Sequence, residues 1–520
     1  MKKIKKIITK NKYTDNNSIE TDIIIIGSGC TGLATALAIL NPEIDYTTFN
    51  NDFNIQISKS NLEKAKKYYN NHNIGSINLK KNNQKLKRNN NNEKISITIV
   101  SLENIEKFCP IDPFNTTQQE IYDEGRLFAI SSKSWQILLS IISELLKLNN
   151  FKQTQIEEIL RIRVVDDNTT AKVDFLSESE ENFGIMINEI ELKNFLRKSL
   201  WFYRDQLNII EKSKIISYQI KKDKIEVNIS NNNDKYDKNS ELEHNIEQFK
   251  DKKSLYDDNI NKNDNTKCIA SLLLACDGKN SSIREYAGIS IKKHDFNQIA
   301  IVFDIHHPNW NHDGVAVQKF RPNGPLAILP KYGGYHSGIV WTEPNNDYDE
   351  KDLLFNKENL LIFLNKILDG YLGDISICSK ISIYPLVSII AQKAFSERIA
   401  LVGDAYHSIH PVAGQGFNLG LRDIITISSL IKNFSNIGLD IGDYLLLKNY
   451  ENSRFLDINL INYGTIFIES LFSSQNTFLQ ITRRFGMNIL NKSSFFKNFL
   501  SSYINNGNIS SFVDSLFKSN

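Results

Sequence analysis

The sequence predicts an α/β protein in which a Rossmann-like, dinucleotide-binding sheet is interleaved with a separate antiparallel β section and followed by C-terminal helices. Three observations support this class. Residues 21–40 read as a buried strand, a glycine turn and an Ala/Leu-rich helix. Residues 398–431 repeat the order of strand, glycine-rich turn and helix late in the chain. Between them, residues 299–341 form short apolar segments that are typical of antiparallel strands.

The composition sets the class of protein before any motif is considered. The chain has 520 residues, 41% of them hydrophobic, which is enough for two or more domains. Its net charge of +2 gives no field that would attract nucleic acid, so we expect no nucleic-acid partner. The five cysteines form no C-x-x-C pair, which favours buried thiols in a reducing compartment. No apolar run approaches the ~18 residues that cross a bilayer, and residues 1–20 read as a polar extension, so we expect a cytoplasmic protein.

The first glycine turn has the spacing of a dinucleotide fingerprint. We expect Gly27 to allow the tight turn, Gly29 to let a pyrophosphate approach the backbone, and Gly32 to let the helix pack on the strand. A glycine-rich structural turn is the alternative. The strand before and the helix after it favour nucleotide binding.

An acidic residue is expected at the end of the second strand, about 20 residues further on. Asp45 and Asp52 are near that distance, but no convincing strand precedes them. Instead, residues 41–94 are rich in Asn and Lys and read as a low-complexity surface insertion. The alternating segment that follows ends in Glu103, which is our candidate for binding an adenosine ribose.

Two further turns are candidates to face a cofactor. Arg126 follows the nucleotide-binding unit and could lie along the cofactor; a solvated arginine is the alternative. Asp277 and Gly278 follow a buried strand rather than joining two alternating ones, which favours a cofactor-facing turn over an ordinary one. Residues 231–267, before that strand, read as a second polar insertion at a hairpin tip.

The late stretch at residues 403–423 suits a cofactor that carries a polyol chain and a ring able to hold negative charge. Gly403 and Asp404 follow a buried strand, and the Asp404 carboxylate can accept hydrogen bonds from sugar hydroxyls. Gly414, Gln415 and Gly416 come before an apolar helical pattern over 421–431. A helix that starts near Gly414 would direct free N–H groups and partial positive charge at the ring. Flavin has both parts.

His407 and His410 are the titratable groups of this stretch. Their spacing of three would suit a metal, but no third ligand is apparent, and we expect no metal. His410 could line a pocket or handle a proton, and the sequence leaves both roles open.

Several motifs resemble a known family. The glycine turn at 27–32, the Asp277-Gly278 turn and the 403–416 stretch together are similar to the FAD-dependent aromatic hydroxylases of the p-hydroxybenzoate hydroxylase fold. The likeness is greater to the ubiquinone-biosynthesis hydroxylases, and within them His410, Pro411 and Phe417 resemble the 2-polyprenyl-6-methoxyphenol hydroxylase branch. The segments that carry this likeness are 123–126, 324–330, 339–341, 384–386 and 410–423.

The resemblance implies FAD as cofactor, NAD(P)H and O₂ as co-substrates, and hydroxylation of a polyprenylated phenol through a flavin hydroperoxide. It implies a catalytic region at His410 and Pro411, with Pro411 beside the flavin ring. Other ubiquinone-biosynthesis proteins and the surface of the inner membrane are the partners that it suggests. The residues that would bind the cofactor are Gly27, Gly29, Gly32, Glu103, Arg126, Asp277, Gly278, Gly403, Asp404, Pro411, Gly414, Gln415 and Gly416.

Three other functions stay open: a different aromatic hydroxylase, a flavin reductase or dehydrogenase with the same fold, and a non-catalytic FAD-stabilised scaffold. The expected organisation assigns 21–150, 185–292 and 385–435 to the FAD-binding domain, 151–184 and 293–384 to the substrate domain, and 436–520 to a helical C-terminal region.

Overall fold

The computed structural model describes residues 13–14, 18–46, 94–103, 126–148, 156–167, 172–176, 182–230, 265–345, 357–410 and 414–473. Most of the two Asn/Lys-rich insertions, Pro411 and the chain after Ser473 lie outside these residues. Within the described residues, no helix combines the length and the apolar character needed to cross a membrane.

A six-stranded sheet forms the centre of the molecule. Its first five strands run parallel and the last one pairs antiparallel. Every residue of β3, β4, β14 and β22 is buried, as expected for parallel strands that are covered on both faces. In spatial order the strands are β10 (Leu207–Ile210), β4 (Ile97–Val100), β3 (Ile23–Ile26), β14 (Leu272–Ala275), β22 (Ile399–Leu401) and β21 (Phe395–Ser396).

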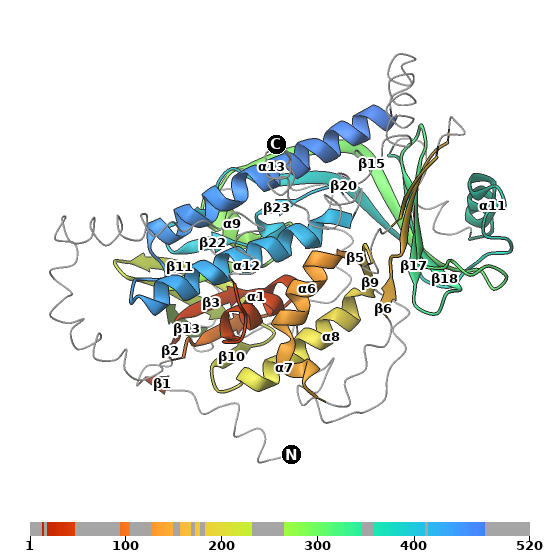
Figure 1. Cartoon of the computed structure of the whole chain (residues 1–520). Coiled ribbons are helices and arrows are strands. Elements are labelled where there is room, and N and C mark those ends of the chain that lie inside the picture. Colours follow the sequence, from red (N-terminus) through yellow and green to blue (C-terminus); the bar gives the residue numbers. More distant parts are fainter. Residues whose placement is uncertain are drawn as a thin grey trace, which may run out of the picture.

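Helices gather beside this sheet, and α1 contacts both α8 and α12 (Figure 1). The apolar pattern at 421–431 predicts only the core of α12, which begins six residues earlier. The short helices α7 and α9 and the 3₁₀ turns η2 and η5 complete this part of the chain. The helical elements are α1 (Cys30–Leu40), α6 (Ser132–Ile141), α7 (Ser143–Leu146), α8 (Glu189–Leu200), η2 (Trp201–Tyr203), α9 (Ser282–Tyr286), η5 (Gly403–Ala405) and α12 (Gln415–Asn436).

A five-stranded sheet packs against the parallel one, because β12 contacts β14 and β13 contacts β3. β13 starts at Asn265, so the last residues of the expected second insertion belong to a strand. Thr266 and Lys267 pair there with Ile229 and Asn228 of β12. The strands in order are β1 (Tyr13–Thr14), β2 (Ser18–Glu20), β13 (Asn265–Ala270), β12 (Lys224–Ser230) and β11 (Lys214–Lys221).

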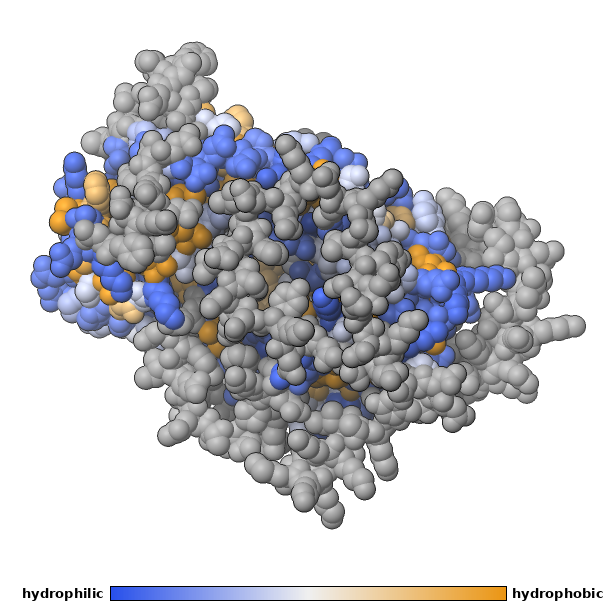
Figure 2. Space-filling model, turned by 180° about the vertical axis from the view of Figure 1, so that it is seen from behind, coloured by the Kyte–Doolittle hydropathy of each residue, from blue (hydrophilic) through white to orange (hydrophobic). Residues whose placement is uncertain are grey.

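A nine-stranded sheet forms the second half of the molecule. Its strands are β23 (His407–Ser408), β20 (Ser382–Ala391), β15 (Ile291–His306), β18 (His336–Pro344), β17 (Leu326–Lys331), β16 (Val315–Phe320), β7 (Arg161–Asp166) and β8 (Lys172–Leu176), with β19 (Ser376–Ile377) beside β15. Seen from behind, apolar side chains gather on the described surface toward this end of the molecule (Figure 2).

The two faces of the nine-stranded sheet have different neighbours. Helix α11 (Lys357–Leu368) buries Leu360, Leu364 and Leu368 against one face. The three-stranded sheet β5 (Leu127–Ser131), β9 (Gly184–Asn188) and β6 (Ile156–Glu158) packs on the opposite side, where Met186 meets Ala316 in one apolar cluster.

The long helix α13 (Tyr444–Ser473) joins the two halves (Figure 1). Tyr450 donates a hydrogen bond to Leu401 O beside β22, at 2.8 Å. Further along, Asn462 accepts one from Ser388 of β20 at 2.6 Å, and Phe472 stacks on Phe320 of β16 with ring centroids 3.8 Å apart. The expected fold class, a Rossmann-like domain with an interleaved β domain and C-terminal helices, is confirmed.

Candidate functional site

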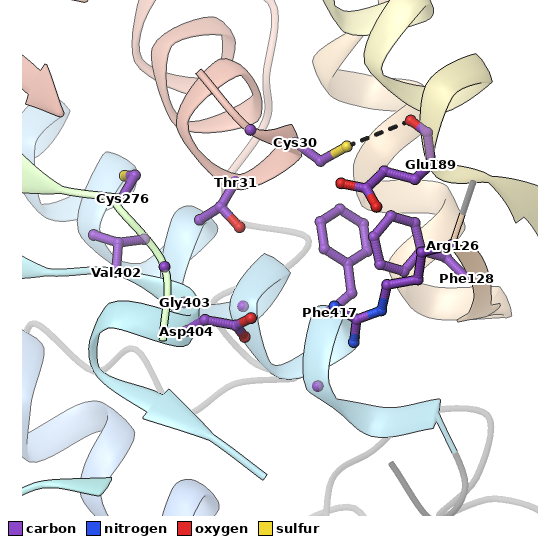
Figure 3. Close-up of a pocket in the computed structure, with 14 residues that line it drawn as sticks. Cys30, Thr31, Arg126, Phe128, Glu189, Cys276, Val402, Gly403, Asp404 and Phe417 are labelled. Carbon is purple, nitrogen blue, oxygen red and sulfur yellow. Dashed lines mark hydrogen bonds between the residues drawn. The ribbon is translucent and has the colours of Figure 1, made fainter. Parts of the chain in front are cut away.

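The two glycine turns, which lie near opposite ends of the chain, meet at one groove. The start of α1 contributes Gly29, Cys30 and Thr31, and the late stretch contributes Gly403 and Asp404 (Figure 3). A Cβ atom on Gly403 would lie 2.8 Å from Thr31 Cγ2. The other lining residues are Arg126, Phe128, Glu189, Cys276, Gly278, Val402, Gly416, Phe417 and Gly420.

Two glycines of the first turn are required by packing. Gly27 has φ +107°, and a Cβ atom there would lie 2.4 Å from Cys276 O. A Cβ atom on Gly32 would lie 2.0 Å from Gly27 O. A side chain at Gly32 would push α1 away from the turn that follows β3, and one at Gly27 would press on the Cys276 backbone after β14. Gly27 and Gly32 therefore set the geometry of the turn.

Three other glycines face open space. A Cβ atom at Gly29, Gly278 or Gly416 would meet no atom within 4 Å. All three line the groove, which means that their exposed backbone is available to a ligand on three sides. This is the feature that separates ligand-facing glycines from packing glycines.

Two helices begin at the groove without side-chain caps. The N-cap residues are Gly29 for α1 and Gly414 for α12, and neither first turn contains an acidic residue. The free N–H groups and the positive end of each helix dipole therefore remain available to an anionic ligand. Gly414 has φ +62°, and its Cβ position lies 3.0 Å from Ala129 Cβ. Gln415 is the first residue of α12 and is not among the groove residues.

Charged side chains point into the space between the glycine turns. The carboxylates of Asp404 and Glu189 and the side chain of Arg126 approach it from different elements (Figure 3). Burial raises the pKa of Glu189, although the positive charge of Arg126 opposes the rise. Glu189 is the first residue of α8, and its position in the groove was not predicted from the sequence.

Gly278 of the Asp277-Gly278 turn lines the same groove, whereas Asp277 is not among the groove residues. Asp277 Oδ2 accepts hydrogen bonds from Ser282 Oγ and Ile283 N, both at 3.2 Å, and so holds the start of α9. Asp277 Oδ1 is buried and has no hydrogen-bond partner among the described residues. Arg284 joins this turn to the late one, because it donates to Lys279 O and to Ala405 O, both at 2.9 Å.

A buried ionic network lies behind the Gly403-Asp404 turn. Asp423 Oδ2 accepts the Gly403 N–H at 2.9 Å and lies 2.6 Å from His407 Nε2. Asp423 Oδ1 accepts from Arg454 Nε of α13 at 2.7 Å. Although burial raises the pKa of Asp423, His407 and Arg454 outweigh it, and the pKa lies below its usual value. The carboxylate is therefore ionised at neutral pH.

Glu103 lies in the turn after β4, which ends at Val100 and pairs with the strand that leads into the first glycine turn. Its carboxylate pairs with Lys193 at 2.5 Å and Arg197 at 3.3 Å, both on α8. Nearby, Ser28 Oγ and Ser101 Oγ are 2.6 Å apart. Glu103 is not among the groove residues, so ribose binding by Glu103 stays a prediction.

His410 is buried, and its ring packs edge-on against Phe296 with centroids 4.4 Å apart. Burial, together with the nearby His294, lowers the pKa of His410 to about 4. The imidazole is thus neutral at pH 7. His410 is not among the groove residues, so both its pocket-lining and its proton-handling role stay predictions. Pro411, predicted beside it, lies outside the described residues.

Side chains that hold the groove together were missed at the sequence level. Asn418 donates to Ala129 O at 2.9 Å and accepts from Ser131 N at 2.9 Å, which ties α12 to β5. Phe128 stacks on Phe417 with ring centroids 4.7 Å apart. The only available signal was that Phe417, Asn418 and Asp423 belong to the segment that carries the family resemblance.

Comparison with known proteins agrees with this geometry. Residues 236–455 match the family described as FAD binding domain. The chain is 37% identical over 218 residues to ubiquinone hydroxylase UbiL of Rhodospirillum rubrum, an alignment covering 42% of this chain and 50% of that protein. It is 29% identical over 218 residues to 3-demethoxyubiquinol 3-hydroxylase of Escherichia coli, covering 42% of this chain and 55% of that protein. The alignments therefore span about half the length of these relatives.

Solved structures with the same fold cover far more of the chain. The p-nitrophenol 4-monooxygenase PnpA of Pseudomonas putida matches with a TM-score of 0.60 and 12% identity, over 94% of this chain and 98% of that one. Klebsiella pneumoniae HpxO, solved with FAD and uric acid, matches with a TM-score of 0.58 and 12% identity, over 94% of this chain and 97% of that one. Residues 236–455 are thus similar to FAD binding domains, the chain shares the fold of these solved structures, and its expected resemblance to the ubiquinone-biosynthesis hydroxylases is confirmed.

Proposed function

We propose that this chain is an FAD-dependent monooxygenase that hydroxylates the ring of a polyprenylated phenol, using NAD(P)H and O₂. The observation that carries the proposal is the single groove shared by the two glycine turns, Asp404 and Arg126. The substrate class rests on the relatives whose names refer to ubiquinone. The narrower likeness to 2-polyprenyl-6-methoxyphenol hydroxylase rests on His410, Pro411 and Phe417.

The residues of the groove fit FAD. Two uncapped helix starts suit a pyrophosphate at Gly29 and a ring that holds negative charge at Gly416. Asp404 offers acceptors to ribityl hydroxyls, and the buried, unpartnered Asp277 Oδ1 offers one more acceptor beside the open Gly278. We assign Gly27 and Gly32 to the shape of the turn, Arg126 to the ribityl and pyrophosphate side, and Glu103 to the adenosine ribose.

When bound, FAD would take electrons from NAD(P)H and use them to activate O₂. The protein would position the cofactor and the substrate, exclude water from the site and stabilise charge on the flavin. The start of α12 would stabilise negative charge on the flavin ring through its free N–H groups. His410, neutral because of its low pKa, would shape the pocket without donating a proton at pH 7.

The residues packed beside Gly414, at the proposed flavin end, are apolar, which would suit a phenol with a hydrocarbon tail. Phe175, Met186 and Ala316 form one buried cluster with Ala129, which lies beside Gly414. These residues come from both the three-stranded and the nine-stranded sheet. The hydroxylated ring would therefore lie where the two halves of the molecule meet.

An apolar substrate must reach the enzyme from a membrane or from another protein of the pathway. The outward face of α13 carries large exposed apolar side chains at Leu456, Leu460, Tyr463 and Phe467. We infer peripheral contact of this face with a membrane surface or a pathway partner. Co-sedimentation with vesicles, lost in a variant with serine at all four positions, would support the membrane.

The visible absorption spectrum of the purified protein is the first test. We expect the bands of oxidised flavin, one FAD per chain after acid release, and NAD(P)H oxidation that yields hydroxylated phenol in equal amount. Reduced flavin that persists in air without product would indicate a reductase instead. A colourless protein that does not take up added FAD would contradict the proposal.

A further inference from the structure

The 403–405 turn is held at both ends by buried charged side chains. At one end the Gly403 N–H donates to Asp423 Oδ2 at 2.9 Å. At the other end Ala405 O accepts from Arg284 at 2.9 Å. Asp404 lies between these two points and faces the groove. The direction of the Asp404 carboxylate therefore depends on both hydrogen bonds.

The Asp423 carboxylate, which accepts the Gly403 N–H, is itself fixed by helix α13. Asp423 is fully buried, and Arg454 of α13 is its counter-ion at 2.7 Å. Arg454 also pairs with Asp457 at 2.6 Å, and Asp457 pairs with Arg422 of α12 at 2.8 Å. The position of the Asp423 carboxylate is thus set by the packing of α13 on α12.

We propose that Asp423 is a positioning residue for the cofactor: it holds the Gly403 N–H so that Asp404 is directed at the ribityl chain. Because Arg454 belongs to α13, this hydrogen bond also depends on the packing of α13 against α12. The inference rests on the proposed function, because the ligand in question is FAD. It assigns to Asp423 an effect on FAD affinity that is separate from its effect on stability.

A single change of Asp423 would confuse the two effects, because it would leave Arg454 buried and unpaired. Arg454→Met removes that charge, and Asp457 keeps Arg422 as its partner. In this background, Asp423→Asn retains an oxygen for the Gly403 and His407 hydrogen bonds and directs its NH₂ at the vacated arginine site. Asp423→Leu has the same branched shape, with two bulkier methyl groups and no acceptor. Both double variants therefore lack the charges of Asp423 and Arg454. They differ in whether residue 423 can accept the Gly403 N–H.

The test is FAD affinity of the two full-length double variants, measured by flavin fluorescence on apoprotein at a temperature where circular dichroism shows both folded. We expect the D423L/R454M protein to bind FAD at least about tenfold more weakly than D423N/R454M, which should stay close to wild type. The Gly403 amide should also exchange its hydrogen faster in the leucine variant. Asp423→Ala in the same background replaces leucine if that protein does not fold.

Asp174→Asn is the control, because it breaks an Arg–Asp pair of 2.8 Å in the nine-stranded sheet, away from the groove. Its FAD affinity should not change. Equal affinities in the two double variants, with FAD bound by the wild type, would overturn this inference alone. A wild type that binds no FAD would overturn both this inference and the proposed function.

Discussion

Gly29 and Gly32 stand three positions apart in one turn, and they meet different surroundings. A Cβ atom at Gly29 would touch nothing within 4 Å, whereas one at Gly32 would lie 2.0 Å from Gly27 O. We expect Gly29→Ala to lower the free energy of unfolding by only about 0.5–1 kcal/mol, the cost of a poorer N-cap, and to weaken FAD binding at least about tenfold. Gly32→Ala should cost more than about 4 kcal/mol. Urea denaturation and FAD titration of both variants measure the difference.

Asp404 carries the acidic contact to the ribityl chain in the proposed complex. Hydrogen bonds to a charged acceptor contribute about 1.5–3 kcal/mol, so Asp404→Ala should weaken FAD binding by about 10–100-fold. Fluorescence titration of the apoprotein gives the value. Asp174→Ala, which breaks an ion pair outside the groove, should bind FAD as the wild type does.

At this scale, residues inside the glycine motifs were predictable and their supporting partners were not. Gly29, Gly403 and Asp404 lie in local patterns of strand, turn and helix, which the sequence displays directly. Glu189 reaches the site only because distant elements pack together, and no local spacing encodes that contact. Arg284 follows the Asp277-Gly278 turn closely in sequence, but its contact with Ala405 O joins distant segments.

Helix α11, which covers the face of the nine-stranded sheet that lies away from the groove, offers a separate test. Leu364 of α11 is fully buried against that sheet, on the side away from the groove. Leu364→Ala should lower the free energy of unfolding by about 2–5 kcal/mol because it leaves a cavity. The affinity for FAD should stay within about twofold. A large loss of FAD affinity in a folded variant would contradict the separation of the two halves.

Buried histidines make the fold sensitive to acid. Burial lowers the pKa of His307 and His312, which lie near one end of the nine-stranded sheet, and lowers that of His410 to about 4. The unfolded chain takes up protons near pH 6.5, before the native state does. Stability is therefore full above about pH 6.5 and falls as the pH decreases toward 4, by about 3 kcal/mol for His410 alone.

Urea denaturation between pH 7.5 and pH 5 measures this loss before most carboxylates titrate. The slope with pH should be smaller for His410→Phe, which has no titrating group in the same space. A midpoint that does not change between pH 7 and pH 5 would show that these histidines are not held neutral.

The start of α12 was predicted by its glycines rather than by its apolar period. The apolar period marks only residues 421–431, whereas the glycine-rich turn placed the helix start near Gly414, and α12 begins at Gln415. The early turns of α12 contain Gly416 and Gly420, which have no apolar side chain to continue the pattern. They are helical because Asn418 and Phe417 fix them to β5. Tertiary contacts thus supplied the part of the helix that faces the groove.

For the whole molecule, the fold class followed from the order of glycine turns and strand types. The interleaving of the two halves could also be predicted. Segments typical of buried parallel strands and segments typical of antiparallel strands follow one another in alternation along the chain. The bridging role of α13 could not be predicted. Its contacts with Ser388 and Phe320 join positions far apart in sequence, and an apolar helical pattern does not specify its partner.

The groove takes its walls from Gly29 near the start of the chain and from Gly420 near its end. When only the first four hundred residues have been synthesised, α12, Asp423 and Arg454 are therefore not yet present. We expect FAD to be acquired after synthesis rather than by the nascent chain. A recombinant protein that stops at residue 400 should retain no flavin on a desalting column, whereas the full chain should elute yellow.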